Sequence, residues 1–319
     1  MIVDSQQKNS ISRGRFLRSA ALLATGFVLA PRELFAQTSP VITIRNEAAN
    51  ALIRVKALRG NIHLLEGSGG NIAVFHGQEG KLMVDSGIAV SQKKIRDTLS
   101  GISQDPIKYL VNTHWHFDHV EGNQWLHKAG ATIIAHKNTR INLSKTISVK
   151  DWNYTFSPSR KGALPTTVFS NEHTLKFNGS EIQMRYYPAA HTDSDISVYF
   201  SEADILQTGD IWWNNHYPFI DHSSGGRLDG MINAVNYLLK QSTNKTIIIP
   251  GHGAAGNKKQ LQEFSNMLVA IKENVSKLKK AGRSLSETIA AKPTAAYDPK
   301  FGKFLVDGAS FTRLVYADV

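Results

Sequence analysis

The stretch Thr113-His114-Trp115-His116-Phe117-Asp118-His119 places four potential metal ligands within six residues of one another. It directly follows the apolar run 107–111, which predicts a buried strand. In a loop that leaves a strand, His114 and His116 can face one point while Asp118 and His119 turn toward a second point nearby. Imidazole suits zinc, copper, iron and nickel, and a carboxylate adds negative charge. Two neighbouring metal ions are therefore the interpretation that we favour.

Three later segments each place a histidine or an aspartate among small residues at the end of a predicted strand. They are Ala189-Ala190-His191, Thr208-Gly209-Asp210 and Pro250-Gly251-His252-Gly253. Small neighbours leave room for a ligand to approach a crowded centre. A surface patch of histidines is the alternative interpretation of the first stretch, and the agreement of four separate segments disfavours it.

Cysteine is absent from all 319 residues, which excludes disulfides, thiolate zinc sites and a cysteine nucleophile. Histidine and carboxylate side chains must therefore supply any metal ligands. The formal net charge of +11 could attract anionic substrates, a membrane surface or nucleic acid. Nucleic acid is disfavoured because the lysines lie mostly on one predicted helix, 257–281, whereas nucleic-acid sites combine such charge with stacking aromatic residues.

Residues 1–36 are predicted to be an export signal that is cleaved. Three arginines precede an apolar run, 20–30, and Ala36 offers a cleavage site. The run is shorter than the roughly 20 residues of a transmembrane helix, so an uncleaved anchor is the less favoured alternative. The segment resembles a twin-arginine signal, except that Gly14 stands where a second adjacent arginine would be expected. We expect a periplasmic or secreted mature chain, 37–319, with a formal charge of +8 and no stable membrane insertion.

Short apolar runs alternate with helix-length segments along the rest of the chain. Strands are predicted at runs bounded by glycine and asparagine, namely 41–44, 62–65, 72–75, 82–84, 107–111, 131–135, 182–187, 196–200, 205–206 and 246–249. Helices are predicted at 90–99, at 230–239 and from Asn257 onward. This mixture predicts layers of helix outside a central pair of sheets.

The ligand pattern resembles that of the metallo-β-lactamase fold superfamily, over about residues 60 to 255. The H-x-H-x-D-H motif at 114–119 is highly specific, and the later ligands follow in the family order. The resemblance implies an α+β fold, a four-layer αββα sandwich with the metals at one edge of the sheets. It also implies a first zinc ion held by His114, His116 and His191, a second held by Asp118, His119 and His252, and Asp210 as the bridge between them.

The aspartate at position 210 narrows the branch of the superfamily that the chain resembles. Many true β-lactamases have cysteine or serine there, whereas aspartate is typical of glyoxalase II, lactonase and related esterase-like proteins. The resemblance therefore implies cleavage of an ester, thioester, lactone or β-lactam bond, with strict lactamase activity less favoured. Glyoxalase II itself fits poorly, because the C-terminal segment has no recognisable glutathione-binding pattern and the chain is expected to be exported. His116 disfavours the flavodiiron relatives, which carry glutamate at this position.

The implied nucleophile is a hydroxide that bridges two zinc ions, since metal binding lowers the pKa of water to about 7. Asp118 would orient this hydroxide and pass a proton to the leaving group, or it would serve as a ligand alone. Iron or manganese could replace zinc. The alternative function is that of an iron-dependent oxidoreductase similar to the persulfide dioxygenases. A silent binding protein is a third hypothesis, which the intact set of ligand positions disfavours.

Several further side chains are candidates for supporting the ligands or the substrate. Asp85 follows the strand 82–84 and is predicted to orient a ligand histidine, with a turn-forming role as the alternative. His136 follows the strand 131–135 and is a second candidate for such support. The substrate is expected to be a small molecule recognised by the loops 145–166 and 212–227. Aromatic and histidine side chains after Asp210 could line its pocket or belong to the core: Trp212, Trp213, His216, Tyr217 and Phe219.

Overall fold

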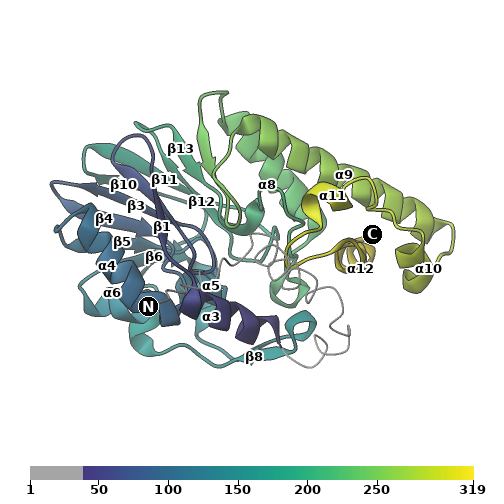
Figure 1. The fold of residues 1–319 in the computed structure, drawn as a ribbon, viewed down its shortest axis with the longest axis horizontal. Coiled ribbons are helices and arrows are strands. Elements are labelled where there is room, and N and C mark those ends of the chain that lie inside the picture. Colours follow the sequence, from purple (N-terminus) through teal and green to yellow (C-terminus); the bar gives the residue numbers. More distant parts are fainter. Residues whose placement is uncertain (1–38) are drawn as a thin grey trace, which may run out of the picture.

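The structure is a computed structural model that describes residues 39–319. The predicted export signal, 1–36, lies outside the described residues. Two large β-sheets pack against each other, and helices cover the outer face of each sheet (Figure 1). This is the four-layer αββα sandwich that the resemblance implies.

The first sheet has seven strands in the order β1-β2-β3-β4-β5-β6-β9. Antiparallel pairs link β1 through β4, and parallel pairs link β4, β5, β6 and β9. Its outer face packs on two helices, where Leu110 and Ile133 of the sheet share an apolar cluster with Ile95 and Leu126. The strands are β1 (Arg54–Ala57), β2 (Ile62–Glu66), β3 (Ile72–Gly77), β4 (Gly80–Val84), β5 (Ile107–Val111), β6 (Thr132–His136) and β9 (Thr167–Phe169).

The second sheet has five strands in the order β10-β11-β12-β13-β14, antiparallel except for the parallel pair β13 and β14. Leu206 and Ile248 on its outer face join Leu238 and Leu268 in the largest apolar cluster. The strands are β10 (Glu172–Phe177), β11 (Ser180–Tyr186), β12 (Ile196–Phe200), β13 (Ile205–Gln207) and β14 (Ile247–Ile249).

Helices form the two outer layers and the segments beside them. Those over the first sheet are α4 and α6, those over the second are α8 and α9, and α12 packs on α8 and α9 farther from the sheet. The helices are α3 (Pro40–Asn50), α4 (Gln92–Ile102), α5 (Phe117–Val120), α6 (Asn123–Lys128), α7 (Lys137–Leu143), α8 (Leu228–Gln241), α9 (Lys258–Lys280), α10 (Leu285–Ala290), α11 (Asp298–Phe301) and α12 (Gly308–Asp318).

The apolar layer between the sheets explains why the chemically interesting loops meet. Alternate residues of β12, namely Ile196, Val198 and Phe200, point into this layer, as the two-residue period of a strand requires. Val84 and Val111 enter it from the other sheet. Strands from both sheets therefore lie close together, and the loops that follow β4, β5, β11, β13 and β14 are brought to one common region.

The predicted strand 41–44 is wrong, because these residues lie in the first turns of α3. The β-branched run favours a strand, but Ser39 caps the helix by accepting a hydrogen bond from Val41 N, and Pro40 occupies the first helical turn. Val41 and Ala48 then pack on Ile88 and Phe117. Cap chemistry and tertiary packing therefore outweigh the local strand preference.

The other predicted strands and helices are found, with ends that move by one to three residues. The structure adds β1, β9, β10 and the C-terminal α12, which the sequence patterns did not indicate. It also places a short hairpin, β7 (Ile147–Val149) and β8 (Tyr154–Phe156), inside the predicted loop 145–166. These missed strands are short or largely exposed, so their apolar periodicity is weak.

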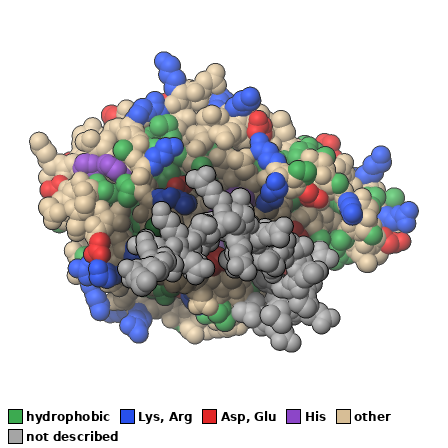
Figure 2. Space-filling model, in the orientation of Figure 1, with side chains coloured by type: hydrophobic (Ala, Val, Ile, Leu, Met, Phe, Trp, Pro, Cys, Tyr) green, Lys and Arg blue, Asp and Glu red, His purple; other side chains and the backbone are tan. Residues whose placement is uncertain are grey.

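Basic side chains are visible at several separate places on one face of the molecule (Figure 2). On the face drawn in Figure 2, Lys and Arg side chains are interspersed with acidic and apolar ones and do not gather in a single patch. Between Ser39 and Val319, none of the helices combines the length and the apolar character that crossing a bilayer requires.

Candidate metal centre

The seven side chains predicted as ligands converge in the structure. The loop after β5 and helix α5 supply four of them, and the loops after β11, β13 and β14 supply one each. They form two groups, and within each group the potential ligand atoms lie within 4.8 Å of one another. All seven residues are buried. The first group is His114, His116, His191 and Asp210, and the second is Asp118, His119 and His252.

Asp210 lies between the two groups. Its Oδ2 atom is 3.4 Å from His191 Nε2 and 3.4 Å from His252 Nε2. Its Oδ1 atom is 3.1 Å from His119 Nε2. One carboxylate therefore contacts histidines of both groups, as a bridging ligand must.

Asp85 holds histidines of both groups through a short chain of hydrogen bonds. Its Oδ2 atom lies 2.8 Å from His119 Nδ1, and its carboxylate accepts hydrogen bonds from Thr113 N and Oγ1, both at 2.8 Å. Thr113 Oγ1 lies 3.1 Å from His114 Nδ1. The Nε2 atoms of His114 and His119 have no hydrogen-bond partner within the described part of the chain. Asp85 thus occupies the supporting position expected for it, at a left-handed backbone angle (φ 64°) that also turns the chain.

Two contacts on the first group were missed by sequence reasoning. His116 Nε2 lies 3.1 Å from Asp221 Oδ2, and His191 Nδ1 lies 2.7 Å from the carbonyl oxygen of Phe219. These partners are acceptors, so the protonated nitrogen of each imidazole points away from the centre. The remaining nitrogens, His116 Nδ1 and His191 Nε2, are 2.8 Å apart. Two lone pairs this close repel each other unless a proton or a metal ion lies between them, so the pair of nitrogens fits a metal ion in place of a shared proton.

The charges of the centre also fit a cationic ligand. Burial lowers the pKa of His191 to about 4, so this imidazole is neutral and able to bind a metal. Burial opposes the charging of His252, yet the carboxylates of Asp210 and Asp118 outweigh it and raise the pKa of His252 to about 9. The pKa of His119 is raised for the same reason. Protons on two histidines thus balance two carboxylates, and a bound cation would replace these protons.

Two glycines allow the close packing of this centre. A Cβ atom on Gly251 would lie 1.9 Å from Asp210 Oδ1, and one on Gly70 would lie 2.1 Å from His119 Cε1. Any larger residue at either position would displace a side chain of the centre. The small residues beside the ligands are therefore a steric requirement, as the sequence indicated.

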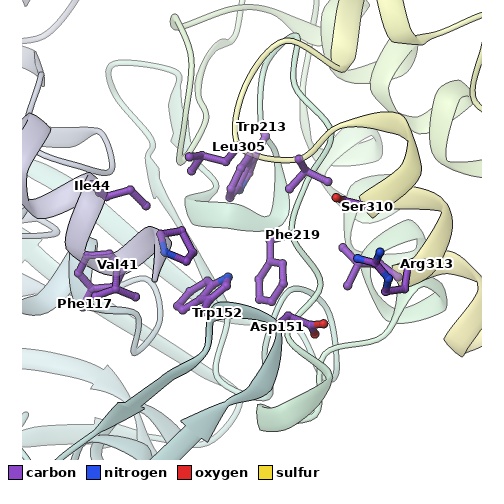
Figure 3. A pocket seen from close by; sticks show the side chains of 13 residues that line it. Val41, Ile44, Phe117, Asp151, Trp152, Trp213, Phe219, Leu305, Ser310 and Arg313 are labelled. Atoms are coloured by element: carbon purple, nitrogen blue, oxygen red, sulfur yellow. The ribbon is translucent and has the colours of Figure 1, made fainter. Parts of the chain in front are cut away.

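Trp213 and Phe219 line a cavity beside the centre (Figure 3). The ring of Trp213 is 4.4 Å from that of His252, and the ring of Phe219 is 6.2 Å from that of His191. The cavity has a volume of about 140 Å³. These two residues have the position expected of a pocket lining.

The other side chains of the same group lie elsewhere. Trp212 and Tyr217 are fully buried in the core around α8 and α9 rather than in this cavity. Tyr217 stacks on Phe311, with ring centroids 4.8 Å apart. His216 packs against Phe304 at 4.5 Å and is likewise outside the cavity lining.

His136 lies at the end of β6, but its hydrogen bonds do not reach a ligand. Its Nε2 atom is 2.9 Å from Ser170 O, and its Nδ1 atom accepts a hydrogen bond from Asn138 N. Its ring stacks on Tyr186 with a centroid distance of 3.7 Å. His136 therefore supports the start of α7, and the expected support of a ligand is not found.

His136 gives a testable dependence of stability on pH. Burial lowers its pKa to about 4 from the ordinary 6.5, so the unfolded state binds more protons as the pH falls below 6.5 and stability is lost toward pH 4. Replacing it in the His136→Phe variant, which keeps an aromatic ring, should remove about 1 to 2 kcal/mol of this loss between pH 7 and pH 5. Urea unfolding of both proteins at pH 7 and at pH 5 measures this difference in the free energy of unfolding. Equal pH slopes in the two proteins would contradict the assignment.

Comparison with known proteins agrees with this geometry. A family model described as the metallo-beta-lactamase superfamily matches residues 65–252. The DIM-1 metallo-beta-lactamase has a TM-score of 0.56 and 19% identity, covering 68% of this chain and 97% of that one. A metallo-beta-lactamase from Pontibacter korlensis has a TM-score of 0.55 and 18% identity, covering 68% of this chain and 99% of that one.

The likeness to a third solved structure extends over more of the chain. The stereoselective inverting sec-alkylsulfatase Pisa1 from Pseudomonas sp. has a TM-score of 0.64 and 15% identity. The match covers 86% of this chain and 51% of the sulfatase chain. At such identities these likenesses show the fold.

Proposed function

The chain belongs to the metallo-beta-lactamase superfamily, a superfamily of metal-dependent hydrolases, and we propose that it uses two zinc ions to cleave an ester, thioester, lactone or β-lactam bond. The observation that carries the proposal is the contact of Asp210 with histidines of both groups. This arrangement favours two neighbouring metal ions over one. All candidate ligands are histidine or aspartate, a set that suits zinc and also accommodates iron or manganese.

The residues of the centre would have different roles in hydrolysis. A bound pair of metal ions lowers the pKa of water to about 7 and polarises the scissile carbonyl. The side chain of Asp118 is 9% exposed and that of His252 is 7% exposed, against 0% for His119 and 3% for Asp210, so Asp118 lies with His252 on the more open side of the centre. Burial opposes its ionisation, but the charge of His119 outweighs this and lowers the pKa of Asp118. Asp118 is thus ionised and can take up a proton and hand it to the leaving group.

We propose a small-molecule substrate rather than nucleic acid. The cavity beside the centre is narrow and aromatic, and the basic residues on the face of Figure 2 are scattered. The predicted export signal would place the mature protein in the periplasm or outside the cell.

Metal analysis combined with a hydrolysis panel tests the proposal. The purified zinc-loaded protein should carry about two zinc ions per chain and hydrolyse a lactone, a thioester, an activated ester or a β-lactam. Hydrolysis of phosphoesters or sec-alkyl sulfates alone would overturn the proposed bond class. Activity should be lost in His116→Ala and kept in His127→Ala, whose exposed histidine lies outside both groups. Fewer than one metal per chain without hydrolysis would overturn the proposal. One iron per chain with thiol-dependent oxygen uptake would establish the oxidoreductase alternative instead.

A further inference from the structure

We propose that the cavity beside the metal centre receives a short apolar acyl chain of the substrate, and that Arg313 binds a carboxylate at the far end of this chain. The inference rests on the proposed function and specifies its substrate class. The compounds expected are esters, thioesters or lactones of a short chain with an anionic end.

The cavity lies against the candidate metal centre, because aromatic rings that line it pack on His116, His191 and His252. Phe117, which lines it, stands in the sequence between His116 and Asp118. Trp152 also lines it, with its ring centroid 4.8 Å from that of His116. A chain that extends from a carbonyl held at the centre would therefore have to pass only these rings to reach the cavity.

Segments outside the family-matched residues 65–252 close the cavity. Val41 and Ile44 of α3 line one side of the cavity, and Leu305 lies beside Trp213 (Figure 3). Leu314 of α12 also lines the cavity. The shape of the cavity thus depends on parts of the chain that precede and follow the matched region.

The size and the lining of the cavity select a short apolar group. Ten of the thirteen lining residues are apolar, so an alkyl chain loses contact with water on entering. A water molecule accounts for roughly 30 Å³ of the liquid. The volume of about 140 Å³ therefore leaves room for several non-hydrogen atoms but not for a long chain, and a hexanoyl chain is a suitable length for the test.

The polar lining residues lie on the side of the cavity away from α3. Figure 3 shows Ser310, Arg313 and Asp151 on the side opposite Ile44. Ser310 and Arg313 are three residues apart on α12, so they share one face of the helix. A guanidinium and a hydroxyl are both donors, and together they match a carboxylate.

The charges of Arg313 and Asp151 determine how strongly the cavity should prefer a substrate with an anionic end. Arg313 forms no ion pair or side-chain hydrogen bond with another residue in the range 39–319. Asp151 is the only acidic residue of the described lining, and it weakens the attraction of an anion. Both side chains are exposed, so water and salt screen them. We therefore expect kcat/KM to be only a few fold higher for a substrate with an anionic end than for a neutral one. Removing the charge of Arg313 should lower this ratio, and removing the charge of Asp151 should raise it.

Three p-nitrophenyl esters test the apolar part: acetate, hexanoate and hydrogen adipate. The zinc-loaded protein should have a kcat/KM for hexanoate about tenfold or more above that for acetate, because buried methylene groups add binding. Ile44→Trp should fill the cavity and abolish this ratio. Ile141→Trp makes the same change at an exposed isoleucine outside the cavity and should keep the ratio. Equal values for acetate and hexanoate in the unmodified protein would overturn the inference.

The same esters test the anionic end. The ratio of kcat/KM for hydrogen adipate to that for hexanoate should exceed one. Arg313→Gln should lower this ratio about three- to tenfold, and Asp151→Asn should raise it. Arg96→Gln, which removes a positive charge from α4, should leave it unchanged. A ratio that does not respond to Arg313→Gln would overturn the role of this residue.

Binding without turnover separates the two proposals. Trp152 and Trp213 line the cavity, so titration with hexanoate or adipate should change tryptophan fluorescence, with adipate binding more tightly. Ile44→Trp should weaken the binding of both, and Arg313→Gln should weaken adipate alone. Such binding in a protein that hydrolyses none of the panel would mean that the proposed function fails and the cavity assignment holds. Hydrolysis of a panel member without binding that depends on the chain would mean that the proposed function holds and the cavity assignment fails.

Discussion

The Asp210→Ala variant is expected to lose both metal ions and to retain less than about one thousandth of the kcat/KM of the unmodified protein. The reason is geometric, since this carboxylate is the group that contacts histidines of both groups, at 3.1 to 3.4 Å. Without it, each group loses a negatively charged ligand. Zinc per chain after gel filtration, together with hydrolysis of an activated ester, measures the effect.

A second variant separates charge from shape at the same position. Asp210→Asn keeps the size of the side chain and removes its negative charge, so it should also lose zinc. Asp204→Ala is the control, because this aspartate bonds Thr246 Oγ1 at 2.7 Å and belongs to neither group. A folded Asp210→Asn protein that still holds two zinc ions would contradict the bridging role.

The positions of the ligands could be predicted from the sequence because each one closely follows an apolar strand. The strand ends fix where the chain leaves the sheets, and the ligands lie within a few residues of these ends. Asp221 could not be found in this way. It lies 105 residues from His116 in a loop whose course depends on tertiary contacts. Its local signal was only that of a turn, in which it accepts hydrogen bonds from Ser223 N and Ser224 Oγ.

The pocket shows a different limit of sequence reasoning. Trp212 and Trp213 are adjacent, chemically identical and part of the same apolar cluster, yet only Trp213 lines the cavity. Trp212 has an extended backbone (φ −133°, ψ 127°), in which successive side chains point to opposite sides. Composition predicts aromatic residues near the centre, but the direction of each depends on where the strand ends. The walls from α3 and α12 depend wholly on tertiary packing.

Asp221→Asn and Asp85→Asn are expected to weaken different metal positions. Asp221 contacts His116 of the first group, and Asp85 contacts His119 of the second. A carboxylate partner fixes the imidazole tautomer and increases its basicity, so losing the charge should lower metal affinity about 10- to 100-fold at the position concerned. Asparagine tolerates the left-handed backbone at position 85, so the turn should survive.

Zinc release to a chelator distinguishes the two positions. The unmodified protein should release its two ions in two steps, which reference variants can assign, since His191→Ala removes a ligand of the first group and His252→Ala one of the second. Asp221→Asn should then weaken the step assigned to the first group, and Asp85→Asn the other. Asp85 also reaches His114 through Thr113, so its variant should weaken the first step slightly as well. Two variants that weaken the same step equally would show that the outer carboxylates do not act on separate metal positions.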